Sequence, residues 1–338
     1  MDAKGKGLDR RRVAKLAVAA GSAAMLPAAA LAQKRASGPI PGLLDGFVAL
    51  PGTKAAQVDV GDGTKAWRAA HAADAGLFCG SCFKTFVLAT YLREVEAGRL
   101  SLDEQLTIDD KVRSTGGAVF EHLTGTTQAR IVLEAMIAHS DNTATDVAMG
   151  RVGADKVRAF IAEAGLAGAR IPDNTRRFFS YLAGYPQGTD MGIEGIRAMV
   201  ADKPGPGPMR QALNDVDTMA CPAATFVGYY KRALAGAFFK KKETLTEFKR
   251  IQAMADAIAL LVPTDTPAYM KGGSIDWNGF HCLAAAGQMI VRGLPVTFAL
   301  TLNWRDSDGD AAAVGAAFKK AAADVLERVR AHIVKGAA

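Results

Sequence analysis

Short runs rich in apolar residues, separated by turn residues, occur near both ends of this chain, which is the pattern of β-strands. The turn residues Gly61-Asp62-Gly63 predict one hairpin, and Arg292-Gly293-Leu294-Pro295 predict another. The predicted strands are residues 47–50, 55–60, 64–68, 269–275, 281–291 and 296–304. The two ends of the chain together therefore predict one antiparallel sheet.

The middle of the chain has a different period, because its apolar residues recur every three or four positions, as on one face of a helix. The predicted helices are residues 81–97, 127–138, 142–150, 154–164, 225–235 and 243–261, followed near the C-terminus by 308–334. Residues 168–190 predict a long irregular surface loop, and the alternating Pro and Gly of 204–208 predict a second break. The predicted fold class is α/β (α+β): an antiparallel sheet built from both chain ends, flanked by helices, with an inserted all-helical lobe.

The first 32 residues have the composition of an export signal. A basic segment at 9–15 precedes a weakly apolar run at 16–31, and Ala30-Leu31-Ala32 forms a small-residue cleavage site. The paired arginines and the Gly/Ala-rich run resemble a twin-arginine signal. We therefore expect the twin-arginine export machinery as a partner and a periplasmic or otherwise exported location after cleavage near Ala32; an uncleaved anchor or a cytoplasmic tail is the alternative. Residues 33–42 are predicted to be a linker, and residues 43–338 a single domain.

Charge and composition exclude some functions. The apolar fraction of 49% and the charged fraction of 22% are ordinary for a globular protein. The formal net charge is +7, but residues 1–32 carry six basic and two acidic residues, so the remaining chain carries +3. This charge is too small to indicate a nucleic-acid partner, and no later apolar run is long enough to span a membrane. We expect a monomer without nucleic acid and without stable membrane insertion.

The chain has four cysteines, Cys79, Cys82, Cys221 and Cys282. The spacing of Cys79 and Cys82 is that of a redox or metal motif, but no second Cys pair and no His pair supports zinc. We expect no metal and no cofactor. Export permits a disulfide from Cys79 to a distant cysteine, and the sequence does not assign the pairing.

The strongest candidate for chemistry is Ser81, which stands three residues before Lys84 at the start of a predicted helix. Residues i and i+3 share a helix face, so a lysine amine can reach the serine hydroxyl. An adjacent base is the minimum requirement for activating a weak nucleophile such as serine. The alternative is a polar first turn with a solvated lysine.

Two further motifs favour the interpretation of Ser81 as a nucleophile over that of a polar first turn. Ser140-Asp141-Asn142 lies at a predicted helix break, and Lys271-Gly272-Gly273-Ser274 lies on a predicted late strand. With Ser81-x-x-Lys84 they resemble the motif set of penicillin-recognising serine hydrolases, and most closely of the class A β-lactamase catalytic domain. The resemblance covers about residues 43–334. It implies a β-lactamase/transpeptidase-like fold whose α/β part is about 43–75 and 262–338 and whose helical lobe is about 76–261.

The resemblance also implies a role for each residue. Ser81 would attack an amide carbonyl and become acylated, with its own N–H and that of Ser274 as the oxyanion hole. Lys84 would be the base, and Ser140 would pass a proton to the leaving nitrogen. The predicted substrate-binding residues are Asn142, Lys271, Gly273 and Ser274, with Lys271 also holding Ser140. Ser140 and Asn142 as plain helix caps and Lys271 as a solvated strand lysine are the alternatives. For His281 two interpretations stay open: it faces the substrate carboxylate, or it is a surface or core histidine.

The sequence departs from the family pattern in two places. Gly272 lacks the hydroxyl that usually contacts the substrate carboxylate, and Ser274, on the same strand face, is its expected replacement. The region 170–179 contains no glutamate to activate the deacylating water, and Asp173 is only a weak candidate. The functions that follow are a serine hydrolase that opens β-lactam rings, a DD-peptidase- or esterase-like hydrolase acting on cell-wall peptides or esters, or a β-lactam-binding protein that is acylated but deacylates poorly.

Overall fold

A computed structural model describes residues 39–62 and 66–336. The predicted export signal and residues 33–38 of the predicted linker lie outside the described residues. The strands are β1 (Thr53–Val60), β2 (Trp67–His71), β3 (Leu77–Phe78), β4 (Gln105–Ile108), β5 (Gly125–Gln128), β6 (Ala220–Cys221), β7 (Ala268–Trp277), β8 (Phe280–Val291) and β9 (Leu294–Arg305). The helices are α1 (Asp45–Val48), α2 (Lys84–Glu96), α3 (Ala129–Ala138), α4 (Asn142–Val152), α5 (Ala154–Glu163), α6 (Thr175–Leu182), α7 (Gly192–Val200), α8 (Ala223–Leu234), α9 (Lys242–Gln252), α10 (Ala257–Leu261) and α11 (Ala311–Gly336). Two 3₁₀ helices, η2 (Gly80–Phe83) and η3 (Asp306–Asp308), complete the described elements.

Five of the strands form one antiparallel sheet in the order β2-β1-β9-β8-β7. The N-terminal strands β1 and β2 pair with the C-terminal hairpin because β1 lies beside β9, with Val58 opposite Phe298. Both residues are fully buried, so burial of apolar side chains on one sheet face fixes this register. The prediction of a sheet built from both chain ends is confirmed.

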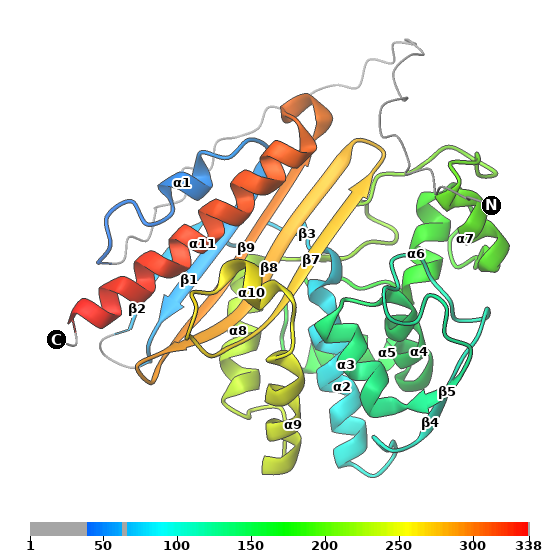
Figure 1. The fold of residues 1–338 in the computed structure, drawn as a ribbon, viewed down its shortest axis with the longest axis horizontal. Coiled ribbons are helices and arrows are strands. Elements are labelled where there is room, and N and C mark those ends of the chain that lie inside the picture. Colours follow the sequence, from blue (N-terminus) through cyan, green and yellow to red (C-terminus); the bar gives the residue numbers. More distant parts are fainter. Residues whose placement is uncertain (1–38, 63–65, 337–338) are drawn as a thin grey trace, which may run out of the picture. The chain divides into compact units, whose positions relative to one another are not determined.

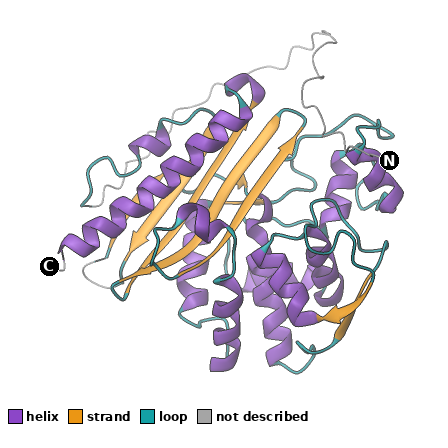
Figure 2. Cartoon of the chain, viewed as in Figure 1, coloured by secondary structure: helices purple, strands orange, loops and turns teal. Residues whose placement is uncertain are grey.

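Helices cover both faces of this sheet (Figure 1). The long helix α11, red in Figure 1, lies across one face together with α1, and Phe47 of α1 packs edge-on against Phe318 of α11 at 5.9 Å between ring centroids. Helix α8 packs on the opposite face, against β1, β8 and β9. The prediction of an antiparallel sheet flanked by helices is confirmed. Helix α10 contacts α11 and β7, and Figure 2 shows most of the other helices gathered to one side of the sheet.

Helix α2 is the central element of this helical lobe. Ten of its 13 residues are buried, because α3, α4, α5 and α9 contact it. Its Phe86 stacks on Phe226 of α8 at 5.6 Å and meets Tyr229 edge-on at 4.8 Å, which joins the lobe to the sheet layer. A helix buried on all sides holds the residues at its N-terminus in a fixed position.

Several predicted elements differ from the structure. Residues 47–50 do not form a strand: Phe47 and Val48 belong to α1, because Leu43, Phe47 and Leu50 bury one helical face. The single predicted helix at 243–261 is divided into α9 and α10. Residues 168–190 contain α6, and the sequence did not predict α7 or the short pairs β3–β6 and β4–β5.

Residues 170–220 form one excursion that leaves and re-enters the fold at the same point. Arg170 and Ala220 close its neck through two backbone hydrogen bonds of 2.7 and 3.1 Å. The Pro/Gly-rich segment 204–208 is mostly exposed, but it runs close to the end of α6, where a side chain at Gly205 would overlap the carbonyl oxygen of Ala183. We call residues 170–220 the neck-closed excursion.

Candidate active site

The centre of the site is a backbone-to-backbone contact between η2 and β7. A Cβ atom at Gly273 would lie 2.9 Å from the backbone nitrogen of Ser81 and would overlap the carbonyl oxygen of Cys79. In return, a Cβ atom at Gly80 would lie 2.7 Å from the backbone nitrogen of Ser274. Only glycine permits so close an approach, and Gly80 also has a left-handed φ of +50°. The contact therefore brings the amides of Ser81 and Ser274 to one place.

Ser81 lies in η2, directly before the first turn of α2, and is partly exposed. Its hydroxyl forms no hydrogen bond with any part of the chain that the structure describes. The N-terminus of a helix carries a partial positive charge and unpaired N–H groups. An oxyanion formed at Ser81 would therefore lie in a favourable field.

Lys84 is fully buried at the start of α2. Its Nζ donates to the Ser140 carbonyl oxygen at 2.6 Å and to Asn142 Oδ1 at 2.7 Å, and it lies 3.4 Å from the Ser140 hydroxyl. The first and second predicted motifs are thus joined by hydrogen bonds, although 56 residues separate Lys84 from Ser140. No hydrogen bond between Lys84 and Ser81 is found among the described residues.

Burial, reinforced by the ammonium of Lys271, holds the pKa of Lys84 well below its usual range. Lys271 is also buried, and burial lowers its pKa as well. An amine whose pKa is lowered is neutral in a larger fraction of molecules at neutral pH, and only the neutral form accepts a proton. Lys84 therefore has the electrostatics of a base.

Ser140 is held in an unusual conformation. Its φ of +57° lies in the left-handed region, which costs a residue with a side chain about 1–2 kcal/mol. The next residue, Asp141, is the N-cap of α4 and accepts from Ala144 N at 2.7 Å. Its other oxygen accepts from Val119 N and Phe120 N at 2.9 Å each. The helix cap of this motif is therefore Asp141, and neither Ser140 nor Asn142 is needed for that purpose.

Asn142 connects Lys84 to the loop on the other side of the site. Its Oδ1 accepts from Lys84, and its Nδ2 donates to the Thr115 carbonyl oxygen at 2.8 Å. Gly116 is next to this contact: a Cβ atom there would lie 3.1 Å from Asn142 Nδ2. One N–H of the Asn142 amide remains for a substrate, as the predicted substrate-binding role requires.

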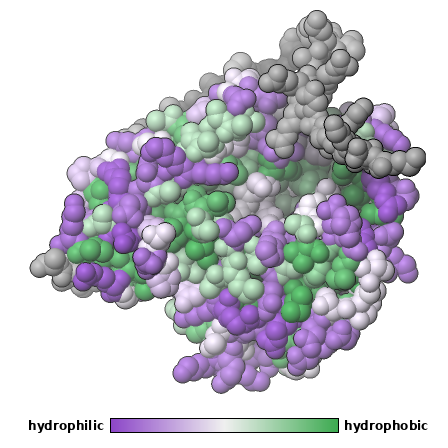
Figure 3. All heavy atoms as spheres, viewed as in Figure 1, coloured by the Kyte–Doolittle hydropathy of each residue, from purple (hydrophilic) through white to green (hydrophobic). Residues whose placement is uncertain are grey.

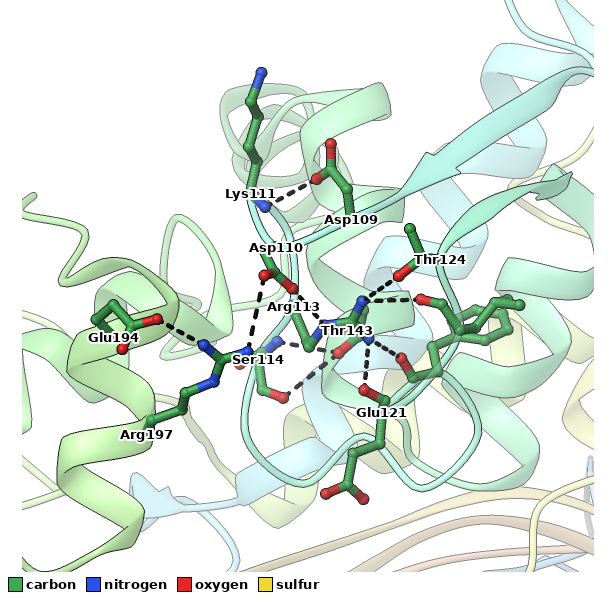
Figure 4. Close-up of polar contacts among 12 residues, drawn as sticks. Asp109, Asp110, Lys111, Arg113, Ser114, Glu121, Thr124, Thr143, Glu194 and Arg197 are labelled. Carbon is green, nitrogen blue, oxygen red and sulfur yellow. Dashed lines mark hydrogen bonds and ion pairs between the residues drawn. The ribbon is translucent and has the colours of Figure 1, made fainter.

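The buried guanidinium of Arg113 holds much of this loop, as Figure 4 shows. Arg113 donates to the carbonyl oxygens of Phe120, Glu121 and Leu123 at 2.6 to 2.9 Å and to the Thr124 hydroxyl at 3.0 Å. The guanidinium has five N–H donors in a fixed plane, so it can hold several loop carbonyls at once. The sequence did not single out Arg113, because its partners are loop backbone atoms that no motif marks.

The third motif lies on β7, the edge strand of the sheet. Lys271 Nζ donates to the Gly272 carbonyl oxygen at 2.9 Å, and no hydrogen bond to Ser140 occurs among the described residues. A Cβ atom at Gly272 would lie 2.9 Å from the Ala257 Cβ of α10, which leaves little room for a hydroxyl-bearing side chain. Ser274 is exposed and has room for the role predicted for it.

Asp173, the weak candidate for the deacylating base, is engaged elsewhere. Its carboxylate binds Arg158 at 2.5 Å and Arg177 at 3.2 Å. The hydrogen bond from Arg158 is the main cause that lowers the pKa of Asp173. A carboxylate that is paired with two arginines and has a lowered pKa is a weak general base.

Asp146, which the sequence analysis missed, is a buried carboxylate beneath the site. It lies on α4 and accepts from the backbone nitrogens of Thr175 at 2.6 Å and Arg176 at 3.0 Å, at the start of α6. Burial raises the pKa of Asp146 to about 7. Asp146 lies one helical turn after Asn142, and this i, i+4 spacing on α4 was the only sequence signal.

The raised pKa of Asp146 predicts a pH-dependent stability. Between about pH 4 and pH 7 the folded chain holds this proton and the unfolded chain releases it, so the free energy of unfolding falls by a few kcal/mol as pH rises through this window. The difference between wild type and Asp146→Asn, measured by denaturant unfolding at pH 5 and pH 8, isolates this contribution. The expected result is a flatter pH dependence in Asp146→Asn; equal slopes would contradict it.

All four cysteines are buried free thiols in the structure. Cys82 Sγ lies 3.2 Å from the Lys271 carbonyl oxygen, and Cys282 Sγ lies 3.1 Å from the Phe78 carbonyl oxygen. Burial raises the pKa of each thiol, so the reactive thiolate is scarce. The thiols pack around the base of η2 and do not form a disulfide.

His281 has two carboxylate partners. Its Nδ1 lies 2.8 Å from Asp276 Oδ1 and its Nε2 lies 2.7 Å from Asp306 Oδ1. The ring also stacks on Trp304 at 5.1 Å between centroids. With both nitrogens occupied, His281 ties the end of β7 to η3 and is not available to a substrate carboxylate.

The described residues contain no group of three or more His, Cys, Asp or Glu side chains arranged for a metal ion. Within the same ranges, none of the helices is both long and apolar enough to cross a lipid bilayer.

Comparison with known proteins gives a consistent result. Residues 52–216 match the model of the beta-lactamase enzyme family, while no curated protein gives a significant match. Among solved structures, the chain is similar to a beta-lactamase from Xanthomonas campestris, with 18% identity, a TM-score of 0.64 and coverage of 85% of this chain and 96% of that chain. It is similar to a beta-lactamase from Chitinophaga pinensis, with 16% identity, a TM-score of 0.65 and coverage of 85% and 97%, and to PBP-A, with 16% identity, a TM-score of 0.64 and coverage of 86% and 96%. The structural matches establish that this chain has the same fold as these proteins, and the match of residues 52–216 agrees with the resemblance to penicillin-recognising serine hydrolases that the motifs carry.

Proposed function

We propose that this protein is an exported serine hydrolase that opens β-lactam rings through an acyl-enzyme on Ser81. The observation that carries the proposal is the contact of Gly80 with Ser274 and of Gly273 with Ser81, which brings two backbone amides beside a partly exposed hydroxyl. Two amides aimed at one point are the usual form of an oxyanion hole, and removing one such donor typically costs about 10²–10³ in rate.

The proposed acylation uses residues that lie together. Ser81 Oγ attacks the lactam carbonyl carbon, and its proton passes to the neutral amine of Lys84. The oxyanion is stabilised by the N–H groups of Ser81 and Ser274. When the C–N bond breaks, the leaving nitrogen takes a proton through the Ser140 hydroxyl, 3.4 Å from Lys84 Nζ. The products of this step are an opened ring and an ester on Ser81.

The pairing of the Asp173 carboxylate with Arg158 and Arg177 favours a second candidate function. Because two arginines hold this carboxylate, Asp173 is a poor base for hydrolysis of the Ser81 ester. The same centre could then serve slow hydrolysis, cleavage of cell-wall peptides or esters, or lasting acylation. These outcomes differ in the lifetime of the acyl-enzyme.

The test is a time course with the chain from residue 33 onward and a chromogenic cephalosporin. We expect colour development and a Ser81 adduct by intact mass spectrometry in wild type, and neither in Ser81→Ala. The control is Ser307→Ala, at an exposed serine in η3. A wild type that is never acylated, or equal turnover by Ser81→Ala, would reject the proposal. An adduct that persists for hours would assign the binding function, and faster cleavage of a D-Ala-D-Ala peptide or an ester would assign the second candidate.

A further inference from the structure

A groove lies at the C-terminal end of α2, away from the candidate active site. It has a volume of about 640 Å³ and is lined by the last turns of α2, by α5 and by the segment that joins α8 to α9. Figure 1 places the end of α2 and the start of α9 at the lower end of the helical lobe, and hydrophilic residues gather there in Figure 3. Ser81 precedes α2, whose 13 residues rise about 20 Å. The groove is therefore separate from the site that contains Ser81.

Charged side chains line most of this groove, and the positive ones are in excess. The lining contains five cationic and three anionic side chains: Arg93, Arg99, Lys156, Lys240 and Lys241, with Glu94, Glu96 and Glu163. With their ordinary ionisation these side chains leave two positive charges uncompensated. The groove therefore attracts an anion.

The two arginines of the groove are already paired with its glutamates. Arg99 donates to both carboxylate oxygens of Glu94 at 2.6 and 2.7 Å, and Lys156 donates to the same carboxylate at 2.8 Å. Arg93 donates to Glu163 at 2.8 and 3.0 Å. Hydrogen bonding from Arg99 is the main cause that lowers the pKa of Glu94 to about 2, so this carboxylate stays charged at neutral pH. The guanidinium groups therefore have partners without a ligand.

The ammonium groups of Lys240 and Lys241 have no such partners. The backbone nitrogens of these residues donate to the Glu96 carboxylate at 2.8 and 2.5 Å, so Glu96 holds the main chain of this segment. Neither ammonium forms a hydrogen bond or an ion pair within the part of the chain that the structure describes, and both lysines are exposed. Glu96 thus fixes a backbone segment that carries two unpaired positive charges.

Two neighbouring ammonium groups match the charge of one phosphate group. A phosphate monoester carries a charge of about −1.5 to −2 at pH 7 and has three strong acceptor oxygens. Lysine binds phosphate as a point charge, whereas the planar fork of a guanidinium matches a carboxylate. Because the guanidinium groups of the groove are paired and the two ammonium groups are not, the groove favours a phosphate over a carboxylate.

The groove also has an apolar wall. Phe238, two residues before Lys240, is partly exposed and lines the groove. Its ring meets Phe160 edge-on at 5.2 Å and stacks on Tyr229 at 5.8 Å between centroids. A ring that is held by two others offers apolar area with little ordering cost. A phosphate alone does not fill about 640 Å³, so an organic group attached to it can lie against Phe238.

We propose that this groove binds an organic phosphate monoester, with the phosphate at Lys240 and Lys241 and the organic group against Phe238. The site does not involve Ser81, so the inference is independent of the proposed hydrolysis and is tested by binding alone. It gives the chain a second binding site at the far end of the helix that follows the candidate nucleophile.

The experiment measures the affinity of the chain from residue 33 onward for phenyl phosphate, by isothermal titration calorimetry at low ionic strength. We expect Lys240→Gln/Lys241→Gln to weaken binding by about 10-fold, because two charge-assisted contacts are lost. The matched control is Lys319→Gln/Lys320→Gln, which removes the same charge from two adjacent exposed lysines of α11. Absence of binding by wild type, or equal affinities of the two double variants, would overturn the inference.

Inorganic phosphate tests the contact with Phe238, because it has the charge of the ligand without the ring. We expect wild type to bind phenyl phosphate about 5-fold more tightly than inorganic phosphate, and Phe238→Ala to bring this ratio close to one. Equal affinity of wild type for both ligands would contradict the contact with Phe238. The two lysines are exposed, so their double variant keeps the test decisive if Phe238→Ala does not fold.

The place of binding is checked by the backbone amide NMR shifts that phenyl phosphate causes. We expect the largest shifts at residues 238–241. Shifts confined to the residues around Ser81 would place the anion in the candidate active site and overturn the inference.

Discussion

Replacing Lys84 with methionine is expected to lower the rate of Ser81 acylation by about 10³–10⁴-fold. Methionine has a similar length but cannot accept the Ser81 proton, so the hydroxyl must react without a base. The burial that lowers the pKa of Lys84 also means that the rate in wild type should rise with pH as the amine loses its proton. The same variant should show no such rise, because the group that titrates has been removed.

The measurement is the rate of adduct formation on Ser81 by quenched mass spectrometry, over pH 5 to 9. Lys320→Met, at an exposed lysine of α11, is the control for loss of a positive charge. The stability of Lys84→Met should change by no more than about 1–3 kcal/mol, because loss of the hydrogen bonds to Ser140 and Asn142 is offset by removal of a buried amine. Acylation of Lys84→Met within 10-fold of wild type would show that Lys84 is not the base.

Gly273→Ala is expected to lower acylation by about 10²–10³-fold, the cost of losing one oxyanion-hole donor. The added methyl group would overlap the Cys79 carbonyl oxygen and lie 2.9 Å from the nitrogens of Ser81 and Cys82. These are backbone atoms, so either η2 or β7 must move. Any such shift separates the amide of Ser81 from that of Ser274.

The matched control is Gly76→Ala, whose added Cβ would have no atom within 4 Å. Acylation rate and thermal unfolding should be measured together, because the same overlap also destabilises the fold by about 1–3 kcal/mol. We expect the acylation rate of Gly273→Ala to fall far more than the loss of folded protein alone would explain. If Gly273→Ala unfolds at a lower temperature but its folded form is acylated at the wild-type rate, the η2–β7 contact is not needed for acylation.

The sheet could be predicted from the sequence because its strands are short apolar runs bounded by turn residues, although β1, β8 and β9 are buried on both faces. The error at residues 47–50 had a local cause: four successive apolar or small residues look like a strand when taken alone. Leu43, Phe47 and Leu50 have the i, i+4, i+7 spacing of a helix, and that spacing becomes visible only over a longer window. Helix α1 then packs on α11, more than 260 residues away in the chain.

Some residues of the candidate site could also be predicted from the sequence, and others could not. Ser81, Lys84, Ser140, Asn142 and the β7 residues belong to short motifs, and the structure brings Lys84, Ser140 and Asn142 into hydrogen-bonding contact. Asp146 could not be predicted, because its partners are backbone amides of α6, 29 and 30 residues away.

The strand order β2-β1-β9-β8-β7 determines at which stage of synthesis Ser81 can become reactive. Ser81 is made early, but the strand that touches it begins at Ala268, so most of the chain must leave the ribosome before the η2–β7 contact can exist. Contacts this distant in sequence form slowly, because the loop between them must close first. An unfinished chain therefore carries Ser81 as an ordinary serine, and the reactive centre arises only as a late event of folding.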